Sequence, residues 1–189
     1  ELPADGPQVL IMHTHGTEAY TPDGADVYTP SGDCRTTDEN YNMIRVGEEI
    51  ASVLTSMGLT VLHDKELYDY PNYSGSYDRS LAAVETYLTQ YPSIQFVLDV
   101  HRDAIEDADG NQYKVVSTVE EGTAAQMTLV VGSDGSGLTH PNWMDNLRLA
   151  VALQEETLRQ YPTLMRPMLL RNSRYNQHVA PGALLLEVG

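Results

Sequence analysis

Several residue types are scarce in this chain of 189 residues. It has one cysteine, one phenylalanine and one tryptophan, and only 11 basic residues stand against 27 acidic ones. The single Cys34 excludes an internal disulfide, which fits the cytoplasm but also many bacterial extracytoplasmic proteins. The net charge of −16 would repel phosphate backbones and anionic membrane surfaces, so nucleic acid is not expected as a partner.

Long hydrophobic runs are also missing. No apolar stretch reaches the about 18 residues of a membrane span, and no signal peptide is present, so the chain as given is expected to be soluble. The chain starts at Glu1 rather than at a methionine, and it stops at Gly189 directly after an apolar run. Both features suggest an ectodomain separated from a membrane anchor.

What the chain has is enough apolar sequence for one domain over residues 1–189. The hydrophobic fraction of 41% is ordinary, and 189 residues suit one substantial core better than two. Tyrosine is abundant, with 12 copies. Such rings suit a carbohydrate or peptide groove, because they pack while the hydroxyl reaches a polar ligand, although an ordinary core edge uses them too.

Hydrophobic periodicity predicts alternating strands and helices. Apolar runs bounded by turn residues indicate strands, and apolar residues at helical spacing indicate amphipathic helices. We expect strands at 9–12, 59–62, 94–100, 115–119, 127–131 and 183–188, with 115–119 and 127–131 as a pair, and helices at 38–57, 80–90 and 143–161. A long polar loop is expected over 16–37. The order predicts an α/β fold with a mostly parallel sheet flanked by helices.

The most informative polar residues fall at the ends of predicted strands, where ligands bind in open α/β sheets. His13 and His15 follow the first strand, His101 follows the strand at 94–100, and Glu187 lies in the last apolar run. A carboxylate in such a run is costly to bury unless it is paired or lies beside a metal. The alternative is an edge strand on which Glu187 faces water.

His15 and Glu18 are three residues apart, close enough to reach one ion from a turn. With the distant His101 they would form the set of about three His and Asp/Glu ligands that a catalytic zinc site uses. A strand would point His13 and His15 the same way, so one of them is expected as a ligand and the other as its supporting or substrate contact. We favour His15. Asp38 and Glu39, which otherwise cap the predicted helix, are the alternative third ligand.

Residues beside His101 suggest supporting roles. Arg102 could hold a substrate carboxylate or stabilise an oxyanion, with Asp103 orienting it, unless the two form a plain surface ion pair. Asp99 lies on the same face of the strand and could accept the second ring N–H of His101. The other histidines, His63, His140 and His178, are interpreted as surface residues.

Competing chemistries find little support. No Gly-x-Ser-x-Gly elbow is present, and Cys34 lies in a loop without a recognisable partner. Glycine patterns of phosphate loops and dinucleotide sites are missing as well.

Short strings along nearly the whole chain resemble the stage II sporulation protein P family, and they occur in the order of that family. They are His13-Thr14-His15-Gly16-Thr17-Glu18-Ala19-Tyr20, Arg45-Val46-Gly47-Glu48-Glu49, Asp99-Val100-His101-Arg102-Asp103-Ala104, Tyr175-Asn176-Gln177 and Leu186-Glu187-Val188-Gly189. The resemblance implies an extracytoplasmic peptidoglycan hydrolase active during spore engulfment. It would be a zinc N-acetylmuramoyl-L-alanine amidase that is also credited with cutting peptide cross-links. Family members carry an N-terminal membrane anchor, missing here, and work with a lytic transglycosylase, stage II sporulation protein D.

The resemblance also carries over individual residues. It places zinc ligands at His15 and His101 and the catalytic carboxylate at Glu187. For the third ligand, the strings of the family favour Glu18, whereas related amidases would point to Asp38 or Glu39. The chain ends before the Asn-rich stretch and closing helix expected after Leu-Glu-Val-Gly.

These observations predict zinc-assisted amide hydrolysis, with Glu187 moving a proton from water to the leaving amine. Two rival functions stay open. One is a non-catalytic cell-wall binding module in which the histidines only line a groove. The other is a zinc carboxypeptidase that acts on free peptides.

Overall fold

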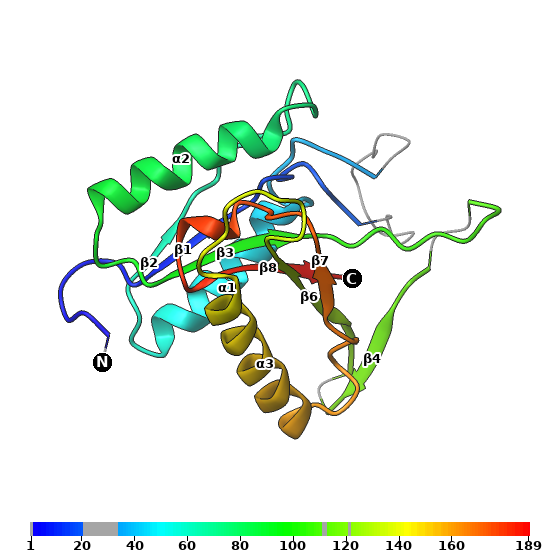
Figure 1. The fold of residues 1–189 in the computed structure, drawn as a ribbon. Coiled ribbons are helices and arrows are strands. Elements are labelled where there is room, and N and C mark those ends of the chain that lie inside the picture. The colour runs from blue at the N-terminus through cyan, green and yellow to red at the C-terminus, as the bar shows by residue number, and fades with distance from the viewer. Residues whose placement is uncertain (1, 21–33, 111–112, 121) are drawn as a thin grey trace.

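A six-stranded sheet forms the centre of the computed structural model, which describes residues 2–20, 34–110, 113–120 and 122–189 (Figure 1). Its strand order is β2-β1-β3-β8-β6-β7. Adjacent strands are parallel except β6 and β8, which are antiparallel. The strands are β1 (Val9–Met12), β2 (Val61–His63), β3 (Phe96–His101), β6 (Met127–Gly132), β7 (Leu169–Arg171) and β8 (Ala183–Val188). The predicted α/β fold with a mostly parallel sheet is confirmed.

Helices cover both faces of this sheet. Figure 1 shows α2 (Ser76–Gln90) on one side and both α1 (Met43–Ser56) and α3 (Trp143–Gln160) on the other. Alternate residues of β1 therefore enter different cores. Leu10 packs in the cluster that contains Val84 of α2, and Ile11 packs in the cluster that contains Met43 of α1. Because both faces are covered, β1 is a continuous apolar run rather than an alternating one.

The first helix starts later than predicted. It begins at Met43, and the side chain of Asn42 caps it by accepting a 2.9 Å hydrogen bond from the Ile44 N–H. Asp38 instead accepts from the Asn40 N–H at 3.0 Å and closes a separate turn. The predicted capping role of Asp38 and Glu39 was wrong, because a short carboxylate can stabilise a turn as readily as a helix start.

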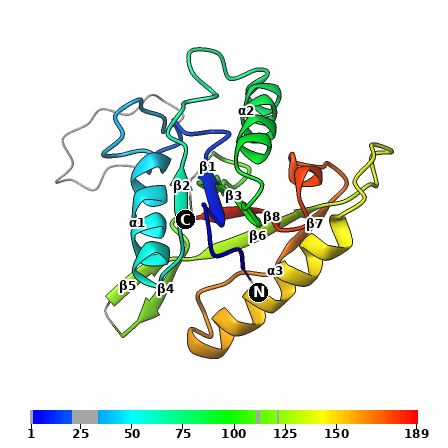
Figure 2. The same cartoon turned by 90° about the vertical axis from the view of Figure 1, so that its left-hand side faces the viewer.

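The strand pairing near residue 120 also differs from the prediction. β4 (Val116–Val119) pairs antiparallel with β5 (Gly122–Ala125) in a separate hairpin, while β6 joins the main sheet (Figure 2). The sequence of β5, Gly-Thr-Ala-Ala, has almost none of the branched and aromatic residues that mark a strand, so it was missed. β7 was missed as well. Of the loop predicted over 16–37, residues 21–33 lie outside the described residues.

Candidate metal centre

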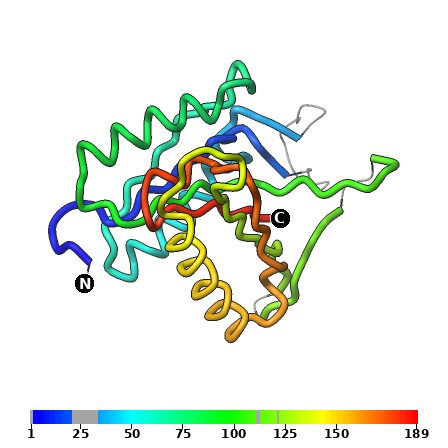
Figure 3. The backbone as a smooth tube through the Cα atoms, in the orientation of Figure 1, coloured from blue at the N-terminus to red at the C-terminus, as the bar shows by residue number. Residues whose placement is uncertain are grey.

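Three neighbouring parallel strands bring the predicted site residues to one edge of the sheet. These strands, β1, β3 and β8, are paired in parallel, so their carboxyl ends lie at the same edge; Figure 3 shows their blue, green and red segments together in the middle of the molecule. His15 lies in the turn after β1, and His101 is the last residue of β3. Glu187 of β8 is the direct register partner of His101, so the two side chains share a face of the sheet.

His15, Glu18 and His101 converge at this edge. All three are buried, and their ligand atoms lie within 4.8 Å of one another. His15 Nδ1 is 3.3 Å from one oxygen of Glu18, and His101 Nδ1 is 3.6 Å from the other. Two imidazoles and one carboxylate match the donor set of a catalytic zinc site, which leaves a further position open. Asp38 and Glu39 are exposed and do not belong to this group.

Asp99 links the two segments that carry the histidines. Its carboxylate accepts from the Thr14 N–H at 2.8 Å and from the Thr14 hydroxyl at 2.6 Å. The same carboxylate lies 2.9 Å from His101 Nε2, the ring nitrogen that faces away from Glu18. Asp99 therefore occupies the supporting position predicted from sequence, where a carboxylate orients a ligating imidazole. The role of Thr14 was not predicted.

Glu18 is held in place by two donors besides the histidines. The Arg102 N–H donates to Glu18 Oε2 at 3.0 Å, and Arg35 Nη2 lies 3.3 Å from Glu18 Oε1. Burial by itself raises the pKa of Glu18. The rings of His101 and His15 more than offset burial and keep the pKa well below its usual range, so the carboxylate is ionised.

Three acidic side chains, Glu18, Asp99 and Glu187, gather around His101. Burial by itself lowers the pKa of His101. The carboxylates of Asp99 and Glu18 more than offset burial and raise this pKa well above its ordinary value. Burial raises the pKa of Glu187 to about 7, and its Oε2 is buried without a hydrogen-bond partner among the described residues. Such a cluster attracts a cation, and a divalent metal between the ligands would supply it.

Aromatic rings from the α2 region border the centre. Tyr73 stacks on His15 with ring centroids 4.7 Å apart, and Tyr77 stacks on His101 at 6.5 Å. Tyr73 is 54% exposed, so it lines the outer side of the site. Neither residue was predicted individually. The excess of tyrosine in the composition was the only sequence signal for them.

His13 faces away from the centre, which corrects the expectation that it points with His15. The strand ends at Met12, so the alternation of a strand no longer applies to the turn that follows. His13 Nδ1 lies 2.8 Å from the Val100 carbonyl, and its Nε2 lies 2.9 Å from His63 Nε2. His13 is fully buried, which excludes substrate contact in this structure.

The His13–His63 pair leaves no room for a side chain at Gly47 of α1. A Cβ at this position would overlap the Nε2 atoms of both rings. Glycine to alanine normally stabilises a helix by about 1 kcal/mol. Here we expect Gly47→Ala to lower the free energy of unfolding by about 1–3 kcal/mol, because the rings must shift. Urea denaturation would measure this, and adding His63→Ala should recover part of the loss; a Gly47→Ala protein more stable than wild type would contradict the packing.

Two further sequence interpretations need correction. The Asp103 carboxylate pairs with Arg166 at 2.6 Å, whereas the Arg102 side chain donates to the backbone carbonyl of Asp103. His140 is 2% exposed and packs edge-on against His178, so it is not a surface histidine.

Within the described ranges, none of the helices combines the length and the apolar character that crossing a membrane requires.

The search of solved structures found a similar fold in the crystal structure of an N-acetylmuramoyl-L-alanine amidase from Clostridium difficile 630. The TM-score is 0.53 at 17% sequence identity, over 97% of this chain and 80% of that one.

Sequence comparison gives a more specific relationship. The chain is 28% identical to the stage II sporulation protein P of Bacillus subtilis (strain 168) over 192 residues, which is 96% of this chain. It spans only 45% of the length of that relative. The model of the family described as stage II sporulation protein P matches residues 1–189. The chain therefore belongs to the stage II sporulation protein P family.

Proposed function

We propose that this domain is a zinc-dependent peptidoglycan hydrolase that cleaves the amide between N-acetylmuramic acid and L-alanine. The observation that carries the proposal is the buried group of His15, Glu18 and His101 with Glu187 beside it. Membership in a sporulation family and the fold shared with an amidase support it. Residues 1–189 would act as one catalytic domain of an anchored extracytoplasmic protein at the sporulation septum. A transglycosylase like stage II sporulation protein D would be its partner.

Each residue of the centre has a distinct task in this proposal. His15, Glu18 and His101 would hold the ion, and Asp99 keeps His101 oriented. Zinc, when bound, supplies a Lewis acid that polarises a carbonyl oxygen and acidifies water. Glu187 would take a proton at its unpartnered Oε2 and deliver it to the leaving amine. Arg102 would hold a carboxylate of the stem peptide.

Product analysis on intact sacculi tests the proposal. We expect the zinc-loaded protein to release whole stem peptides that begin with L-alanine and to leave glycan strands free of peptide. Cross-link cleavage as a second activity would appear as shortened bridges between peptides. Release of single C-terminal amino acids would instead indicate a zinc carboxypeptidase. Binding to sacculi with no product and no metal would indicate a cell-wall binding module.

A further inference from the structure

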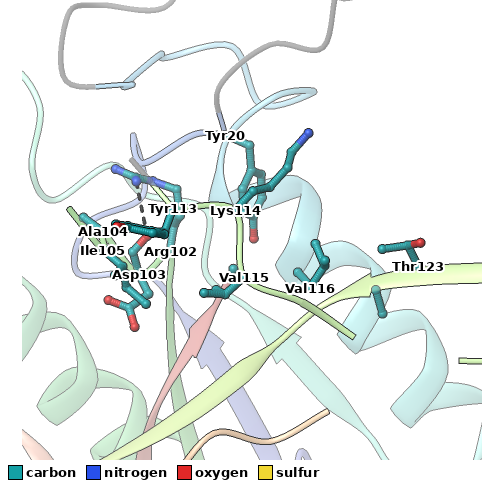
Figure 4. Close-up of a pocket in the computed structure, with 13 residues that line it drawn as sticks. Tyr20, Arg102, Asp103, Ala104, Ile105, Tyr113, Lys114, Val115, Val116 and Thr123 are labelled. Atoms are coloured by element: carbon teal, nitrogen blue, oxygen red, sulfur yellow. Dashed lines mark hydrogen bonds between the residues drawn. The ribbon is translucent and has the colours of Figure 1, made fainter. Parts of the chain in front are cut away.

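A pocket of about 610 Å³ opens beside the metal centre, and Arg102 is the one lining residue that has a role in the function proposed above (Figure 4). Its size falls in the range of sites that bind small ligands or peptide segments. Its walls come from three stretches of chain that follow site residues and from the β4–β5 hairpin. The lining includes Tyr20, Arg102, Tyr113, Lys114, Val116 and Gly189.

One wall continues directly from the centre. Tyr20 lies two residues after Glu18, Arg102 follows His101, and Gly189 lies two residues after Glu187. Tyr20 donates a 2.8 Å hydrogen bond from its hydroxyl to the Val188 carbonyl, which ties this wall to β8. A ligand that binds in the pocket would therefore reach to the metal centre along this wall and stay in contact with the protein over its whole length.

The opposite wall is apolar and accessible. Val115, Val116, Ala124 and Ala125 come from the hairpin and the segment that leads into it. Val116 is 50% exposed. Figure 4 shows Val116 between Tyr20 and Thr123 and Val115 below Tyr20, so small aliphatic groups of a ligand would find contact there.

The charged groups of the pocket are mostly positive, although the whole chain carries −16. Arg102 and Lys114 form no ion pair with any carboxylate of the described residues. Arg102 Nε is buried and has no hydrogen-bond partner among the residues that the structure describes. The acidic residue of the lining, Asp103, is neutralised by Arg166. Two cations without carboxylate partners beside an apolar wall suit an anionic ligand with small side chains.

We propose that this pocket binds the peptide part of the substrate and selects peptides with free carboxylates, which Arg102 and Lys114 receive. The proposal depends on the proposed function for its substrate class. It adds a location for the peptide, a second recognition residue in Lys114, and a selectivity for acidic over amidated peptides. An extended peptide advances about 3.3–3.6 Å per residue, so a pocket of this size accommodates a segment of a few residues.

Calorimetric titration with a free peptide tests this without any need for hydrolysis. The probe is N-acetyl-L-alanyl-γ-D-glutamyl-Nε-acetyl-L-lysine, which carries two carboxylates and no ammonium group, and its matched partner has both carboxylates amidated. We expect the acidic peptide to bind wild-type protein about fivefold more tightly than the amidated one, since a solvent-accessible charge pair contributes modestly. Lys114→Ala removes one of the two cations, so it should weaken binding of the acidic peptide by about twofold and leave the amidated peptide unaffected.

Arg148→Ala is the control, because it also removes one exposed positive charge, from α3. It should leave both affinities unchanged. Equal affinity for the two peptides, no measurable binding at millimolar concentration, or an unaltered affinity in Lys114→Ala would overturn the pocket assignment. Failure of the proposed function looks different: the protein would bind the acidic peptide selectively but would hold no zinc and release no product from sacculi.

Discussion

Glu187→Gln is expected to keep one equivalent of zinc and the wild-type fold while amide hydrolysis falls by about 10²–10⁴-fold, the contribution typical of a general acid–base group. Glutamine has nearly the same shape as glutamate but cannot accept the proton. Glu187 is the register partner of His101, yet it does not belong to the metal-ligand group. Initial rates on purified muropeptides, together with zinc content by atomic emission, would measure both effects.

The matched control for this variant is Glu156→Gln on α3. Glu156 is an exposed acidic residue that pairs with Arg159, so its replacement makes the same chemical change away from the site. Hydrolysis at the wild-type rate by Glu187→Gln would remove Glu187 from the chemistry. Loss of zinc in that variant would instead make Glu187 a ligand, and the proposed division of roles would be wrong.

The second large effect concerns the ligand set. We expect His15→Ala, Glu18→Gln and His101→Ala each to lose stoichiometric zinc, because a site with three protein ligands has none in reserve. Free zinc at 100 times its dissociation constant should stabilise the wild-type protein by about 2.7 kcal/mol, and this gain should vanish in the three variants. Thermal denaturation with and without zinc, after treatment with a chelator, measures the difference.

Asp38→Asn and Glu39→Gln are the controls that decide the third ligand. Both carboxylates are exposed and lie outside the buried group, so both variants should bind zinc as wild type does. His178→Ala controls for the loss of a histidine elsewhere. Loss of zinc from Asp38→Asn or Glu39→Gln, with retention in Glu18→Gln, would contradict the ligand set proposed from the structure.

The sequence alone was sufficient for the fold class and for most of the main sheet. β1 and β8 are apolar runs buried by helices or neighbouring strands, and such runs are visible without a structure. β5 was not visible, because Gly-Thr-Ala-Ala has little intrinsic preference for a strand and pairs only through its position opposite β4. The start of α1 was missed because Asp38 satisfies a local turn instead of the helix.

For the site, the sequence determined which residues could take part, and the tertiary structure decided which of them meet. The spacing of His15 and Glu18, and the position of His101 and Glu187 at strand ends, follow from the chain itself. The choice of Glu18 over Asp38 and Glu39 as neighbour of the histidines depends on a turn held by Asp99 from a strand 85 residues away. Local pattern does not encode such long-range contacts. The same reason explains why His13 turned away to His63, and why the pocket with Arg102 and Lys114 became apparent only after the hairpin was placed beside the sheet.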